Sequence, residues 1–189
     1  MNTIVTSRDA ILKKSRELIL QDGYDSLNIR KIATESGISI GTIYNYFDSK
    51  AELLSATIES IWYEIFYPIN HREDNIPLKE IIAQFYACFE YGNKKYPGFI
   101  ALHSIGFMDK EKKEAQNRMH ELMESMIHKL SLALEQDPCL RKGAFDTILT
   151  PHKFARVIFS IILADALQKK YDYEIVLEVI KRTLYESYL

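Results

Sequence analysis

The sequence is short of the residues that make tight turns. It contains only 7 Gly and 5 Pro among 189 residues, and these two residue types supply much of the special backbone geometry of turns. No segment alternates apolar and polar residues as a half-buried strand does. We therefore expect the all-α fold class, with one compact domain or one domain and a small appendage at this length.

Cysteine and long apolar runs are also scarce. The two cysteines, Cys88 and Cys139, lie in unlike contexts without a metal-ligand spacing, which favours reduced thiols over a disulfide framework. The longest strongly apolar stretch, residues 157–164, is far shorter than the roughly 18 residues that cross a bilayer. The first residues do not read as a secretory signal. We expect a cytoplasmic protein with no membrane association, no metal and no cofactor.

Neither sign of charge is in large excess. The 24 Lys and Arg stand against 26 Asp and Glu, a net charge of -2, so composition alone does not indicate a nucleic-acid partner. Residues 1–50 nevertheless carry seven basic against six acidic side chains. Any nucleic acid must therefore be bound by a local surface.

Capping residues predict three short helices in the first 50 residues. Ser7, Asn28 and Ser39 are good N-caps, and Gly23 and Gly37 are suited to the ends of helices. Between these signals, apolar residues recur at the spacing of one helical face. The expected helices cover residues 8–22, 29–36 and 40–47.

Longer apolar-periodic segments predict a helical body after residue 50. A long helix is expected to run from residue 50 to an interruption at Pro68. Further helices are expected over residues 77–95, 99–107, 110–136, 151–170 and 173–188.

The helix at 151–170 is apolar nearly all round, which is typical of a helix buried on more than one side. A second subunit is one way to cover it, so this helix and the next are predicted to form a dimer interface. A purely internal core helix is the alternative. The predicted interface residues are Phe154, Val157, Ile158, Ile161, Ile162, Ile175, Val179 and Leu184.

The segment from Asn28 to Lys50 has the length and the glycine-containing turn of a helix-turn-helix. At about 100° per residue, Ile40, Ile43 and Phe47 fall on the inner side of its second helix. The outward side is small, polar and uncharged. Solvated helix faces normally carry charge, so this face suits the edges of DNA bases instead.

Each residue type on that face has a matching DNA group. Asn45 can pair bidentately with adenine, the Thr42 methyl can meet a thymine methyl, and Gly41 allows close approach of the backbone. Tyrosine hydroxyls, nearby cations and helix N-termini suit phosphates. The predicted DNA-binding residues are Arg30, Ser39, Gly41, Thr42, Tyr44, Asn45, Tyr46 and Lys50.

This stretch resembles the TetR family of transcriptional regulators, whose recognition segment reads Gly-Thr-apolar-Tyr-x-Tyr-Phe with a Lys two or three positions on. Residues 41–47 read Gly-Thr-Ile-Tyr-Asn-Tyr-Phe, and Lys50 follows. The resemblance covers about residues 7–66. It implies a homodimer that binds a palindromic operator and releases it when a small ligand enters the carboxy-terminal body. One departure is Ile40, where the family often has a basic or polar residue.

The resulting architecture has two parts. Residues 1–50 form a three-helix helix-turn-helix head, and a long helix joins it to a ligand-binding and dimerisation body, residues 51–189. Aromatic and methionine side chains in the body would suit an apolar or aromatic effector. The predicted pocket residues are Trp62, Phe66, Phe85, Tyr86, Phe89, Phe99, His103, Phe107 and Met123.

Several features of the sequence are compatible with functions other than a ligand-released repressor. Residues 37–41 match the G-x-S-x-G elbow of esterases, but no strand leads into Ser39, so no enzyme is expected. His120, Glu124 and His128 have a metal-compatible spacing that a solvated face explains better. An architectural or protein-recruiting factor that uses the same head without an effector remains open, and so does a protein-interaction module without DNA contact.

Overall fold

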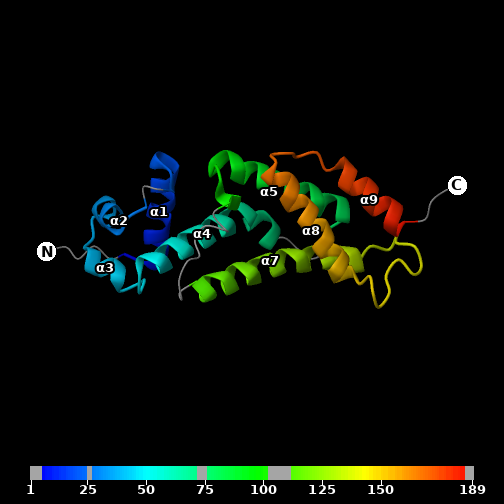
Figure 1. Cartoon of the computed structure of the whole chain (residues 1–189), viewed down its shortest axis with the longest axis horizontal. Helices are drawn as coiled ribbons and strands as arrows, with labels where there is room; N and C mark the ends of the chain where they lie inside the picture. Colours follow the sequence, from blue (N-terminus) through cyan, green and yellow to red (C-terminus); the bar gives the residue numbers. More distant parts are fainter. Residues whose placement is uncertain (1–5, 25–26, 72–75, 102–111, 186–189) are drawn as a thin grey trace. The chain divides into compact units, whose positions relative to one another are not determined.

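The computed structural model describes residues 6–24, 27–71, 76–101 and 112–185, with side chains from residue 117 onward in the last range. All regular elements in these ranges are helices (Figure 1), which confirms the all-α fold class. The helices are α1 (Arg8–Asp22), α2 (Ile29–Ser36), α3 (Ile40–Tyr44), α4 (Lys50–Asn70), α5 (Leu78–Lys95), α7 (Lys112–Glu135), α8 (Pro151–Leu167) and α9 (Glu174–Leu184). No described helix is long and apolar enough to cross a membrane.

The chain divides into two compact units. Residues 1–64 and 95–119 form the head unit, and residues 65–94 and 120–189 form the body unit. Helices α4, α5 and α7 each run from one unit into the other. The functional boundary expected at residue 50 remains a prediction.

The three predicted N-caps are confirmed. The Ser7 hydroxyl accepts a hydrogen bond from the Ala10 amide at 3.1 Å, and the Asn28 side chain accepts one from the Lys31 amide at 2.8 Å. The Ser39 hydroxyl accepts one from the Thr42 amide at 3.0 Å. Each bond satisfies an amide that has no partner within its own helix.

Several helix boundaries differ from the expectation. Helix α3 ends at Tyr44 rather than at Phe47, although the amide of Phe47 still donates to the Ile43 carbonyl at 3.1 Å. Helix α4 continues through Pro68 and ends two residues later at Asn70, so the proline falls in its last turn. Helices α8 and α9 end at Leu167 and Leu184. Most of the helix expected at 99–107 lies outside the described residues.

The core of the head unit joins its helices through apolar side chains. Ile11, Ile32 and Ile43 are each at most 1% exposed, as is Trp62 of α4. The Trp62 indole meets the Phe99 ring edge-on at a centroid distance of 5.1 Å. Each buried side chain of this size contributes about 1.5–3 kcal/mol, so α1, α2, α3 and the first part of α4 form one packed group.

The body unit is packed around aromatic rings. Phe66 meets Phe89 at 4.9 Å, and Phe85 and Phe89 meet Phe159 of α8 at 5.8 and 6.4 Å. Asp165, a polar residue within α8, accepts a hydrogen bond from the Tyr86 hydroxyl at 2.6 Å. The partner of this carboxylate is therefore a residue of the same chain.

Candidate nucleic-acid interface

A tight turn between α2 and α3 sets the position of the recognition segment, residues 39–47. Gly37 adopts the left-handed conformation with φ 65° and its amide donates to Thr34 at 3.1 Å. The amide of Ile38 then reaches back to the Ala33 carbonyl at 3.0 Å. These two bonds close the end of α2 and start α3 in a new direction. Ile43 and Phe47 are buried and anchor the segment.

The outward side of the recognition segment lies on the surface. Gly41 and Asn45 are exposed, and the exposed fractions of Tyr44 and Tyr46 are 47% and 37%. Ile40 is 41% exposed, so its predicted inward placement is wrong. The reason is that α3 makes little more than one turn, and its buried side consists of Ile43 and the following Phe47.

The side-chain hydroxyls of Ser39 and Thr42 are hydrogen-bonded to each other. Their hydroxyl oxygens lie 2.9 Å apart, in addition to the N-cap bond. With its hydroxyl held in this way, Thr42 has its methyl group left for an outside contact. A Cβ added at Gly41 would meet only the Ser39 hydroxyl, at an ordinary 3.6 Å. Packing within the chain therefore does not require this glycine, whereas close approach of a partner would.

Two predicted cations, which lie on either side of the recognition segment in the sequence, have no acidic partner among the described residues. Arg30 of α2 and Lys50 at the start of α4 are exposed, and neither forms an ion pair with any described residue. The neighbouring Lys31 differs, because its amine lies 2.7 Å from the Asp22 carboxylate. Arg30 and Lys50 therefore keep their charge for an external anion.

Sequence reasoning missed the contribution of residues 6–8. The Tyr46 hydroxyl donates to the Thr6 carbonyl oxygen at 2.7 Å, and the Arg8 guanidinium lies over the Phe47 ring at 5.0 Å. These contacts join positions about 40 residues apart. A local pattern gives no signal for such a pairing.

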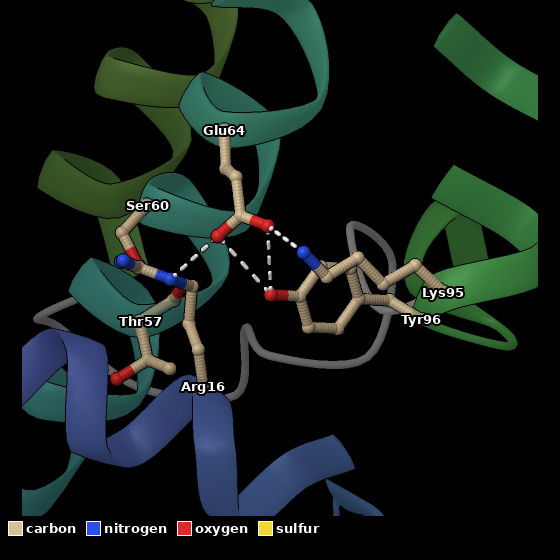
Figure 2. A network of polar contacts seen from close by, with 6 residues as sticks. All are labelled: Arg16, Thr57, Ser60, Glu64, Lys95 and Tyr96. Atoms are coloured by element: carbon tan, nitrogen blue, oxygen red, sulfur yellow. Dashed lines mark hydrogen bonds and ion pairs between the residues drawn. The ribbon is translucent and has the colours of Figure 1, made fainter. Parts of the chain in front are cut away.

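A carboxylate on α4 links three segments of the head unit (Figure 2). Glu64 accepts from Arg16 of α1 at 2.9 Å and from Lys95 at the end of α5 at 2.6 Å. The Tyr96 hydroxyl lies 3.2 Å from both oxygens of the same carboxylate. Burial, and then the Glu64 charge, raises the pKa of Tyr96 to about 12. The cluster therefore fixes α1 and the end of α5 to α4.

The predicted pocket residues lie in both units. Trp62 and Phe99 pack in the head core, while Phe66, Phe85, Tyr86 and Phe89 are buried in the body. Met123 is partly exposed, and His103 and Phe107 lie outside the described residues. The body unit has a groove of about 500 Å³, but none of the predicted residues lines it. Its lining includes Ile76, Leu78, Ala133, Asp137, Cys139 and Tyr185.

The predicted dimer residues divide by exposure. Phe154, Ile158, Ile162 and Leu184 are at most 5% exposed within the single chain, so they serve its own core. Val157, Ile175 and Val179 are 53%, 73% and 42% exposed, and Ile161 is partly exposed. Only this second group is available to another subunit in this conformation.

Glu124, which has a metal-compatible spacing with His120 and His128 in the sequence, interacts with two side chains of α8. Its carboxylate accepts from Arg156 at 2.8 Å and lies 3.4 Å from His152, both on α8. His120 and His128 are exposed. No group of three His, Cys, Asp or Glu that could hold a metal ion occurs among the described residues.

The short second helix, the glycine turn and the exposed recognition segment define a helix-turn-helix protein. Residues 11–57 match the family model described as bacterial regulatory proteins, tetR family. Within the head, these residues therefore carry the helix-turn-helix of the TetR family of bacterial regulatory proteins.

Two curated relatives of the chain are nucleoid occlusion factors. Nucleoid occlusion factor SlmA of Vibrio cholerae is 22% identical over 68% of both chains, and SlmA of Actinobacillus pleuropneumoniae is 30% identical over 49% of this chain. The latter alignment spans about half of that relative, 48% of its length.

Solved structures share the fold. A Rhodococcus protein described as a TetR-family transcriptional regulator matches with a TM-score of 0.64 at 17% identity, over 93% of this chain and 97% of its own. The multidrug binding protein EbrR, complexed with proflavin, matches with a TM-score of 0.56 at 13% identity, over 93% and 98%.

Proposed function

We propose that this protein is a repressor that binds a palindromic operator as a homodimer and is released by a small molecule. The observation that carries the proposal is the exposed and uncharged surface of the recognition segment. Asn45 and Tyr44 stand on it, and Thr42 has its hydroxyl held by Ser39. Such a surface is suited to hydrogen bonds and methyl contacts with base edges, with Arg30 and Lys50 beside it for phosphates.

The homodimer part of the proposal rests on the exposed apolar side chains of α8 and α9. Val157, Ile175 and Val179 would be covered by the same helices of a second copy. A twofold pair of heads would then read two half-sites, and the operator symmetry would follow from the protein symmetry.

The effector is proposed to be an apolar or aromatic molecule bound by the body. The aromatic side chains of the body unit support this chemistry. The bound proflavin of EbrR is a compatible example from a protein of the same fold. Release requires that the effector bind one of two conformations more tightly than the other.

The SlmA relatives favour a second candidate, a DNA-bound factor that acts without an effector. The two candidates differ in whether any small molecule changes the affinity for DNA. The deciding experiment selects operators from genomic fragments with the purified protein and then screens ligands on the enriched duplex. A ligand that lowers operator affinity supports the repressor. Selective DNA binding that no ligand in a broad apolar and aromatic set alters supports the second candidate.

A further inference from the structure

Residues 6–8, which lead into α1, are held beside the end of the recognition segment. The Tyr46 hydroxyl donates to the Thr6 carbonyl at 2.7 Å. The Arg8 guanidinium carbon lies 5.0 Å from the centre of the Phe47 ring. Phe47 is itself buried, with 1% of its surface exposed, so it forms a fixed base for the cation. Two adjacent residues, 46 and 47, thus determine where Arg8 lies.

Arg8 is a cation without an acidic partner. It is exposed, and it forms no ion pair with any described residue, including the adjacent Asp9. Elsewhere on α1, Lys14 pairs with Glu17 at 2.7 Å and Arg16 pairs with Glu64 at 2.9 Å. A ring face attracts a guanidinium but leaves its positive charge intact. The charge of Arg8 is therefore available at the edge of the recognition segment.

The recognition segment needs cations supplied by its neighbours. Residues 36–47 contain no Lys, Arg, Asp or Glu. Neutralisation of phosphates provides much of the affinity of proteins for duplex DNA. Arg30 supplies a charge from α2 and Lys50 supplies one from α4. Arg8 is placed to supply a third from α1.

We propose that Arg8 binds a DNA phosphate and that Tyr46 is a positioning residue that holds Thr6 and Arg8 against the recognition segment. The assignment rests on the proposed DNA-binding function and adds a contact from α1 to it. It also changes the role of Tyr46. In place of a direct phosphate contact, its hydroxyl fixes the backbone of the residues before α1.

The test measures how duplex affinity depends on salt. Binding to a duplex of unrelated sequence and to the selected operator is titrated over a series of KCl concentrations. Arg8→Gln is expected to reduce the slope of log affinity against log salt by about 0.9 per bound protomer, on both duplexes. Arg8→Lys restores the charge and is expected to restore the slope. The matched control is Lys13→Gln, which removes one exposed charge from the same helix and is expected to leave the slope unchanged.

A double-mutant cycle separates positioning from direct contact. Tyr46→Phe removes only the hydroxyl, and its effect is expected to shrink strongly in the Arg8→Gln background, since both changes disable one contact. Full additivity would mean that the Tyr46 hydroxyl touches DNA itself and would overturn its positioning role. An unchanged salt slope for Arg8→Gln, with the melting transition intact, would overturn the Arg8 assignment. If the unaltered protein retained no duplex at all, the proposed function would fail as well.

Discussion

Asn45 and Lys50 are expected to contribute to DNA binding in different ways, although they lie only five positions apart. Asn45 faces outward from the end of α3 and suits one base, whereas Lys50 suits a phosphate. Asn45→Ala should weaken binding by roughly 1–3 kcal/mol at one operator position. Lys50→Ala should weaken all sequences about equally and reduce the salt slope by about one.

The measurement for this pair is a binding titration on the operator, on single-base variants and on unrelated DNA. Loss of discrimination at one base pair should accompany only the Asn45 change. Equal losses from both substitutions on every duplex would contradict these two roles.

The two thiols should differ sharply in reactivity. Burial raises the pKa of Cys88 to about 11, so only about a thousandth of it is thiolate at pH 8. Cys139 is exposed and lines the groove of the body unit. A colorimetric disulfide reagent should titrate one thiol per chain at once and the second only after unfolding.

Cys139→Ser is the control for the thiol assignment, and it should remove the fast reaction entirely. Two rapidly reacting thiols in the folded protein would show that the α5 helix opens around Cys88.

At the scale of helices, the local sequence correctly predicted the N-caps, because capping is decided by neighbouring residues. Ser7, Asn28 and Ser39 accept the amide hydrogen bonds expected of caps, because an N-cap depends only on the next three residues. The exposure of Ile40 was not predictable from its spacing alone. Which side of a one-turn helix is buried depends on the neighbours that pack against it, and α2 is the helix in contact with α3.

The Glu64 cluster should stabilise the head unit more than an ordinary surface ion pair does. Glu64→Gln leaves Arg16 and Lys95 without their shared anion, and these side chains are one-fifth to one-third exposed. We expect the free energy of unfolding to fall by about 1–2 kcal/mol, measured by urea denaturation.

The matched control is Glu90→Gln, which removes the carboxylate from an exposed pair with Lys94 one turn away on α5. Its cost should stay within about 0.5 kcal/mol. Similar losses from the two variants would mean that the cluster adds nothing beyond a solvated contact.

At the scale of the whole molecule, the sequence predicted the helical architecture but not which apolar residues of α8 are buried in the protomer core and which are exposed. Phe154 and Ile158 face the protomer core, while Val157 between them is half exposed. Periodicity identifies an apolar helix, but the split between core and interface depends on which neighbours pack against it.

The exposed residues of α9 give a direct test of the proposed homodimer. Ile175→Asp places a charge at a position that is 73% exposed in the single chain. Burying it in an interface would cost several kcal/mol, so dimers should dissociate to monomers in light scattering after gel filtration. Ile148→Asp, at a position 80% exposed and outside the helices, should leave the mass unchanged. An unaltered protein that elutes as a monomer would contradict the homodimer.

The interleaving of the two units bears on how the DNA-binding part can be isolated. The head unit takes in residues 95–119 as well as the first 64. A peptide cut after Glu64 would leave behind the Phe99 ring that packs on Trp62, and two of the groups bound to the Glu64 carboxylate. The indole of Trp62 would then be exposed to water, and the peptide would be prone to self-association. A minimal DNA-binding fragment of this protein should therefore also contain residues 95–119, joined to the first segment by a short artificial linker.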